Sequence, residues 1–201
     1  MNWGEIQIES LKKMFLNSDD ITADNLDTYK KDKKYRTYLS AMPQAANEAI
    51  NYILENGKPL VKSYKLKYKD TNNKYNLETL IPNFKRIYQI VCEDNNVEYY
   101  VEGNNVLAIN GWSENGKDII VYYESAHELL KSSSSASTLI SLSKYLTSLI
   151  PLYIAVELYK DDDMQMATMY MNEFMTNVAN ITGKDFNPNP KEITSVFGME
   201  W

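Results

Sequence analysis

Two runs of apolar residues with helical spacing flank a short acidic segment in the C-terminal third of the chain. Each run places apolar side chains at steps of three and four, the spacing of one face of an α-helix. The segment Asp161 to Asp163 supplies acceptors for the free amides at the start of the second helix. The pattern predicts an αα-hairpin between Leu142 and Ile181. The two runs are Leu142, Tyr145, Leu146, Leu149, Ile150, Tyr153 and Ile154, then Ala167, Tyr170, Met171, Phe174, Met175 and Val178.

Pro151 lies inside the first run. That helix is therefore expected either to bend there or to begin its packed part there, with proline in its first turn. A hairpin with two apolar faces is not stable alone, so other helices must cover it.

The N-terminal part of the chain also has helical spacing. A first helix is predicted from Trp3 to Leu16, with a narrow apolar face. A second begins near Thr22 or Asp24 and is interrupted at Pro43. A third, from Pro43 to Asn56, carries a clean apolar face and ends at Asn56-Gly57, followed by Pro59; it is the expected partner of the hairpin.

From Leu60 the period changes from 3.6 to 2, which predicts β-structure. Residues that accept a positive φ recur between the strands, so antiparallel hairpins forming a meander or a small barrel are expected. After Leu60, the predicted strands are Phe84 to Cys92, Val97 to Val101, Asn105 to Ile109 and Asp118 to Tyr123. The serine run Ser132 to Ser135 marks the return to helices.

The sequence thus predicts an α+β fold: a helical bundle with an inserted antiparallel β subdomain and an extended C-terminal tail. The expected parts are residues 1–59 (N-terminal helices), 60–125 (β insertion), 126–182 (C-terminal helices) and 183–201 (C-terminal arm). The arm contains two prolines and no helical period of useful length. It nevertheless carries large apolar side chains, whose exposure to water is unfavourable. These either fold back on the parent domain or dock on a partner, with equal weight. They are Phe186, Ile193, Val196, Phe197, Met199 and Trp201.

Composition adds one unusual feature. The 201 residues are 44% hydrophobic and 24% charged, ordinary values for a globular protein, but sixteen of them are tyrosines. Tyrosine is favoured both in strands and at protein interfaces, so strand propensity and partner binding explain it equally well.

Charge and cysteine content narrow the class of protein. The net charge of −6 argues against an extended phosphate-binding surface. The basic run from Lys30 to Arg36 fits a solvated helix face better than a nucleic-acid site. A single cysteine, Cys92, excludes an internal disulfide and a cysteine-based zinc site. No secretory signal and no apolar run of about 18 residues is recognised, so no membrane association is expected.

Catalytic patterns are missing from the sequence. It contains no G-x-x-x-x-G-K-[ST], G-x-G-x-x-G, H-E-x-x-H or G-x-S-x-G. His127 is the only histidine and is expected to be an ordinary helix or loop residue. Asp161 to Asp163 lack the glycine and glutamate of a calcium loop, so helix capping explains them better. No catalytic residue, metal ligand or cofactor is predicted, and the chain is not expected to be an enzyme.

Two segments resemble a known family. The helix YLSAMPQAANEAINYILENG, from Tyr38, and the hairpin LIPLYIAVELYKDDDMQMATMYMNEFMTNV, from Leu149, flank a β insertion. In their order along the chain and in their local sequence they resemble tailed-bacteriophage head-to-tail connectors, the adaptor rings that dock beneath the portal. The pattern IPLYIA, LYKDDD, AT-x-Y-x-NEF carries most of the resemblance.

The resemblance implies a structural virion protein at the head-tail neck, made in the host cytoplasm. It would form a homo-oligomeric, dodecameric ring that closes the DNA-filled head, lets DNA pass its lumen without sequence-specific binding, and presents a platform for tail or neck proteins. The arm residues Phe186, Ile193, Val196, Phe197, Met199 and Trp201 would contact the portal. Tyr99, Tyr100 and Trp112 of the β insertion would face the tail side. The alternative is a binding module whose aromatic sheet holds a polysaccharide or cell-surface ligand.

Overall fold

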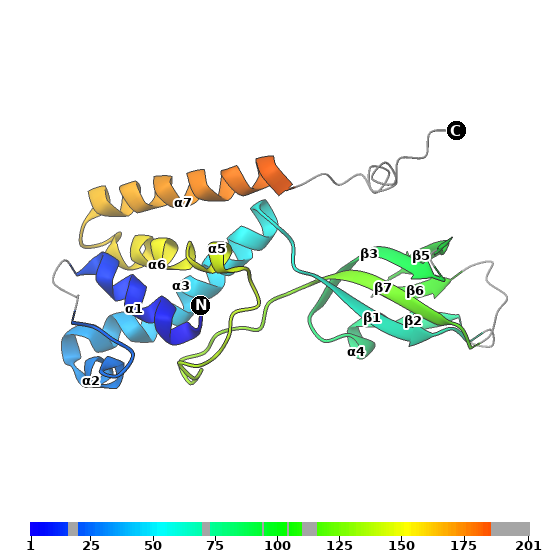
Figure 1. The fold of residues 1–201 in the computed structure, drawn as a ribbon, viewed down its shortest axis with the longest axis horizontal. Helices are drawn as coiled ribbons and strands as arrows, with labels where there is room; N and C mark the ends of the chain where they lie inside the picture. Colours follow the sequence, from blue (N-terminus) through cyan, green and yellow to red (C-terminus); the bar gives the residue numbers. More distant parts are fainter. Residues whose placement is uncertain (16–19, 70–72, 94, 104, 110–115, 186–201) are drawn as a thin grey trace. The chain divides into compact units, whose positions relative to one another are not determined.

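The computed structural model of the chain describes residues 1–15, 20–69, 73–93, 95–103, 105–109 and 116–185. It combines helices with antiparallel sheets, which confirms the predicted α+β class (Figure 1). The chain divides into two compact units. One joins Met1–Lys58 to Ser132–Trp201 and is helical, and the other, Pro59–Lys131, contains the strands.

The described part of the helical unit contains α1 (Trp3–Met14), α2 (Leu26–Lys31), α3 (Lys33–Asn56), α5 (Lys144–Thr147), α6 (Ile150–Tyr159) and α7 (Met164–Asp185). Helix α6 contacts α1, α3 and α7 (Figure 1). Nine of its ten residues are apolar or aromatic, Glu157 being the exception, and those from Ile150 to Val156 are buried apart from the half-buried Tyr153. This is the composition of a helix covered by neighbours on most of its surface. α6 is therefore the core of the bundle.

Helix α1 is more deeply buried than its sequence predicts. The predicted narrow apolar face is wrong, because Trp3, Ile6, Leu11 and Met14 are all almost inaccessible to solvent and Ser10 is buried among them. The Ser10 hydroxyl donates to the carbonyl of Ile6 at 2.7 Å, which satisfies it without a partner from another element. A short polar side chain bonded to its own helix can thus lie in a core.

Pro43 does not interrupt a helix, as the sequence predicted. It lies inside α3, which continues from Lys33 to Asn56. Proline removes one intrahelical hydrogen bond and costs about 3 kcal/mol in a helix interior. Here Pro43 is buried with Met42 and Ala46 on the packed face of α3, and that burial offsets the cost. The break lies earlier, at Asp32, whose carboxylate caps α3 by accepting from the amide of Lys34.

Pro151 marks a helix start. Helix α6 begins at Ile150 with proline in its first turn, one of the two predicted outcomes, and the short α5 precedes it. The predicted capping of the following helix is confirmed at Asp163, whose carboxylate accepts from the amides of Gln165 and Met166. The predicted end near Ile181 is too early, since α7 continues through Asp185.

The described part of the β unit forms two antiparallel sheets. Its elements are β1 (Val61–Lys67), β2 (Lys74–Asn76), α4 (Leu77–Leu80), β3 (Phe84–Cys92), β4 (Asn95–Asn96), β5 (Tyr99–Glu102), β6 (Val106–Ile109) and β7 (Asp118–Ser125). One sheet has the order β1-β7-β3-β4 and the other β2-β6-β5.

The strands enclose a single core, as in the small barrel that the sequence offered as one arrangement. They do not form a simple meander, because β1 pairs with β7, from the opposite end of the unit. The predicted strand Val97 to Val101 is divided: β4 pairs in the first sheet and β5 in the second. The segment from β1 to β2 likewise passes from one sheet to the other. Leu66, Ile119 and Leu107 show that both sheets contribute to the shared core.

Candidate interaction surfaces

The acidic segment between α6 and α7 is held by α3. The Tyr38 hydroxyl donates to the carboxylate of Asp162 at 3.0 Å, and this hydrogen bond is the main cause that raises the pKa of Tyr38. Asp163 caps α7 at the same place. The acidic residues thus position helices, which fits the predicted capping role.

Two tyrosines fasten the end of α1 to the hairpin. Tyr170 of α7 donates its hydroxyl to the carbonyl of Lys13 at 2.9 Å, and Tyr159 of α6 donates to the carbonyl of Met14. Carbonyls in the last turn of a helix lack intrahelical partners, so these hydroxyls satisfy groups that would otherwise be open. Burial raises the pKa of both tyrosines.

The exposed part of α7 includes three methionines. Met164, Met169 and Met175 are 75%, 50% and 43% exposed, whereas Phe174 and Val178 are buried. The prediction that Met175 belongs to the packed face is therefore wrong. Between Met164 and Ile181, Glu173 is the only charged residue of α7. We call these three exposed methionines the methionine face; they lie among exposed polar side chains such as Gln165, Thr168 and Thr176. Exposed methionine is a flexible side chain that adapts to protein partners.

The two described tyrosines of the predicted tail-side site lie on β5. Tyr99 and Tyr100 are both exposed on this end strand of the smaller sheet. Because successive residues of a strand point to opposite faces, the two rings cannot form one flat platform. Trp112, the third residue of that predicted site, lies outside the described residues, as do Phe186, Ile193, Val196, Phe197, Met199 and Trp201 of the predicted arm.

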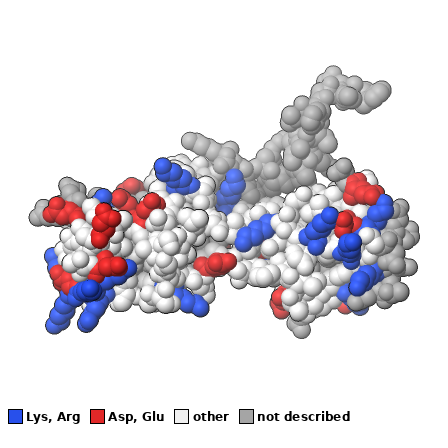
Figure 2. Space-filling view, turned by 60° about the horizontal axis from the view of Figure 1, so that its bottom comes forward, with Lys and Arg blue, Asp and Glu red and all other residues white. Residues whose placement is uncertain are grey.

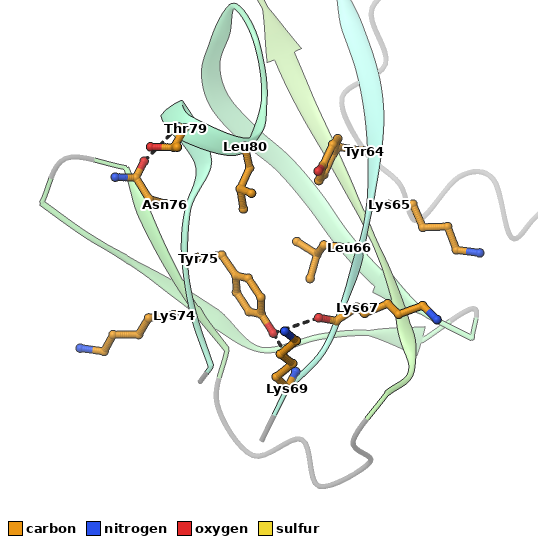
Figure 3. A pocket seen from close by; sticks show the side chains of 10 residues that line it. All are labelled: Tyr64, Lys65, Leu66, Lys67, Lys69, Lys74, Tyr75, Asn76, Thr79 and Leu80. Carbon is orange, nitrogen blue, oxygen red and sulfur yellow. Dashed lines mark hydrogen bonds between the residues drawn. The ribbon is translucent and has the colours of Figure 1, made fainter. Parts of the chain in front are cut away.

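A cavity of about 500 Å³ lies between β1, β2 and α4. Tyr64, Leu66, Tyr75 and Leu80 turn their side chains into it, while Lys65 points away to the outer face of the sheet (Figure 3). Leu66 is nearly buried, whereas Leu80 is 39% exposed and reaches the cavity mouth. The cavity is therefore an apolar groove that opens to solvent.

Basic residues border this groove. Lysines gather on one face of the β unit (Figure 2), and those at the groove are Lys65, Lys67, Lys69 and Lys74. Lys65 pairs with Asp118 at 2.7 Å and Lys74 with Glu102 at 2.6 Å. Lys67 and Lys69 make no ion pair with any described residue. The groove thus has an apolar floor, and the strand β1 that lines it carries lysines on its outer face.

The sequence did not predict this groove, because β2 and α4 were missed. A signal for α4 was present: Asn76 caps it, accepting from the amide of Thr79 at 3.1 Å, and Asn at such a position is a helix-start signal. No comparable signal existed for the position of β1 at the end of its sheet. Its partner β7 lies far along the chain, and the order of strands depends on long-range pairing.

His127 lies in a loop, one of the two placements expected from the sequence, and is buried. Burial, with a contribution from Lys85, lowers its pKa. Among the residues that the structure describes, no group of three or more His, Cys, Asp or Glu side chains is placed to hold a metal ion. Within the same residues, no helix has the length and apolarity needed to cross a membrane.

The structure is thus an α+β protein with exposed methionines on α7 and a groove beside β1. Comparison with protein-family models and with curated proteins finds no match to this chain.

Proposed function

We propose that the chain is a structural adaptor of the tailed-bacteriophage neck, without enzymatic activity. In this role it forms a ring beneath the portal, closes the DNA-filled head and presents a platform to tail or neck proteins. The proposal starts from the resemblance of the α3 and α6–α7 segments to head-to-tail connectors. The physical properties of the helical unit support it.

The observation that carries the proposal is the methionine face of α7. A ring subunit needs surface beyond its own core that a neighbour can bury, and α7 presents three exposed methionines and a single charge between Met164 and Ile181, among polar uncharged side chains. Burial of exposed methionine against another chain is favourable. A second copy of the helical unit is the occupant that a ring requires.

The remaining assignments follow the same scheme. The arm of residues 183–201 begins in the last turn of α7 and is assigned to the portal through Phe186, Ile193, Val196, Phe197, Met199 and Trp201. Tyr99, Tyr100 and Trp112 of the β unit are assigned to the tail side. The net charge of −6 is compatible with a lumen through which DNA slides without being bound.

The test is a mass measurement on the protein mixed with its portal. Native mass spectrometry or analytical ultracentrifugation should detect a complex in which one ring of this chain is bound to one portal ring. A persistent monomer that ignores the portal contradicts the proposal. A monomer in the absence of portal does not, because such rings can require the portal as a template.

The second candidate function is a binding module for a polysaccharide or cell-surface ligand, and exposed Tyr99 and Tyr100 favour it. Their placement on opposite faces of β5 weakens it, since a sugar ring stacks on one continuous aromatic surface. Binding on a glycan array that is lost in the Tyr100→Ala variant would support this function over the adaptor.

A further inference from the structure

Strand β1 has an open edge. It is the end strand of the larger sheet, and among the described strands only β7 pairs with it. The hydrogen bonds at its two ends, Ser125 N to Leu60 O and Tyr68 N to Lys117 O, show that even-numbered residues of this segment bond to β7. Backbone groups alternate between the two sides of an antiparallel strand. The N–H and C=O groups of Val61, Ser63 and Lys65 therefore point to the open side, where no described residue bonds to them.

The open edge ends near Lys67, where the side chain of Tyr75 forms the hydrogen bonds that a neighbouring strand would otherwise form. The Tyr75 hydroxyl donates to the carbonyl of Lys67 at 3.2 Å and accepts from the amide of Lys69 at 2.9 Å (Figure 3). One donor and one acceptor of the β1 edge are thus already satisfied at this end. The segment from Val61 to Lys65 remains open to a further strand.

A strand added at this edge would have two different faces. Strands in a sheet lie about 4.8 Å apart, so it would run beside β1, over the groove. Side chains on its inner face would meet Tyr64, Leu66 and Leu80. Those on its outer face would lie beside Lys65 and Lys67, which share a face of the sheet with Asp118 and Ile120.

Charge decides which strand fits. Four of the nine residues from Val61 to Lys69 are lysines and none is acidic. Lysine on an end strand prevents two copies of the same edge from pairing, because like charges would face each other. The same charges attract an acidic segment. Two copies of the β1 edge are therefore not expected to pair with each other, whereas an acidic strand can pair with it.

We propose that the edge of β1 from Val61 to Lys65 binds an extended segment of a partner protein by strand addition, and that this segment alternates acidic and apolar residues. Main-chain hydrogen bonds provide affinity, and the apolar groove and the lysines select the sequence. The open edge and the groove are features of the β unit alone, so this site does not require the adaptor role.

The first test uses the full chain and a fluorescent peptide that alternates glutamate and valine. Saturable binding is expected by fluorescence anisotropy, and added salt should weaken it because the lysines contribute. A matched peptide with lysine in place of glutamate should not bind. A peptide with proline at alternate positions should fail as well, since it lacks backbone donors.

The variant pair Ser63→Pro and Ser63→Ala separates backbone pairing from side-chain contact. Proline removes the N–H that points to the open side and leaves the pairing with β7 intact, so it is tolerated at a sheet edge. Ser63→Pro should weaken binding by about tenfold or more, a difference of about 1.4 kcal/mol, and Ser63→Ala should not. Lys67→Glu should also weaken it, whereas Lys144→Glu, on α5 in the helical unit, should have no effect.

Amide hydrogen exchange provides a readout that does not depend on any variant. On peptide binding, the amides of Ser63 and Lys65 should become protected, while those of Tyr64 and Leu66 are already slow through β7. The proposal is overturned by absence of binding, by equal binding of the lysine–valine peptide, or by binding that leaves Ser63 and Lys65 unprotected. Self-association of two β1 edges, seen as a dimer that Ser63→Pro abolishes, would also overturn it.

Discussion

Gly4 sets how closely α1 approaches the segment that returns from the β unit. Its amide donates to the carbonyl of Ala136 at 2.8 Å, and the amide of Trp3 donates to Thr138 at the same distance. A Cβ at position 4 would lie 3.0 Å from Cβ of Ala136 and 3.2 Å from its carbonyl oxygen. The two backbones are already joined by hydrogen bonds, so neither can retreat without weakening them.

Gly4→Ala should therefore destabilise the helical unit by about 1 kcal/mol or more, despite the higher helix propensity of alanine. Urea denaturation followed by circular dichroism measures the change. Gly103→Ala is the control, because nothing lies within 4 Å of a Cβ there, and it should leave stability nearly unchanged. Equal stability of the Gly4→Ala variant and the wild type would contradict this prediction, because it would show that the segment around Ala136 can shift to accommodate the added Cβ at little cost.

Tyr170 belongs to the pair of tyrosines that satisfy the carbonyls at the end of α1. Tyr170→Phe removes the donor to Lys13 and leaves that carbonyl without its partner, at a cost of about 1 kcal/mol. Tyr145→Phe is the control, because Tyr145 is 52% exposed and its hydroxyl makes no hydrogen bond to a described residue. Chemical denaturation should separate the two variants, and equal loss in both would contradict the assigned role.

The same tyrosines predict how stability depends on pH. Burial raises the pKa of Tyr159 and Tyr170 above the ordinary value of about 10. A raised folded-state pKa contributes stability that is fully present below the unfolded pKa and is lost as pH rises through the folded pKa. The free energy of unfolding should thus hold up to about pH 9 and fall above about pH 10. Denaturation curves across this range test it, and Tyr170→Phe should reduce the slope.

At the scale of elements, helix α7 has a packed face and a free face with separate roles. Phe174 and Val178 on the packed face hold the bundle together, whereas Met169 and Met175 contribute little to the fold because much of their surface is already exposed. The double variant Met169→Glu/Met175→Glu should keep the thermal stability of the wild type. It should lose assembly with portal, since buried unpaired carboxylates are costly at an interface.

Sedimentation of the mixture with portal, beside a melting curve of the variant alone, separates these two properties. Met169→Leu/Met175→Leu is the matched control and should still assemble, because it retains an apolar face of similar size. Assembly that survives both glutamates would remove the methionine face from the proposed ring contact.

Elements defined by local pattern were predicted best. Strand β3 occupies the predicted range from Phe84 to Cys92, and α3 ends at Asn56, where Gly57 follows. Pro151 was interpreted with two outcomes and the structure selects one. Pro43 was misread because local rules count the lost hydrogen bond but not the burial that offsets it. The burial of helix α1 was underestimated for a related reason. How much of a helix surface is buried depends on packing against elements that are distant in sequence.

At the scale of the whole molecule, the sequence predicted the α+β class but not the pairing of the strands. The position of β1 beside β7 follows from contacts between the two ends of the β unit. The candidate sites divide in the same way. Tyr99 and Tyr100 were found because aromatic residues in a strand are visible in the sequence, whereas the groove of Tyr64, Tyr75 and Leu80 exists only once β1, β2 and α4 are placed together.

Because the chain divides into two units, the proposed portal and tail contacts can be tested separately, and this leads to the last prediction. Removal of residues 186–201 leaves every described helix complete, since α7 ends at Asp185. The shortened protein should keep the circular dichroism spectrum and melting temperature of the full chain. If the arm carries the portal contact, binding to portal rings in a pull-down should be lost.

The Ser63→Pro variant is the reciprocal control, because it alters only the edge of the β unit. It should bind portal as the wild type does and fail with the acidic peptide, whereas the shortened protein should bind the peptide and fail with portal. This crossed pattern would assign the two contacts to different segments of the chain, and loss of both in one variant would indicate general unfolding instead. A shortened protein that folds and still binds portal would show that the apolar residues of the arm do not make this contact. The methionine face of α7 would then be the described surface left to do so.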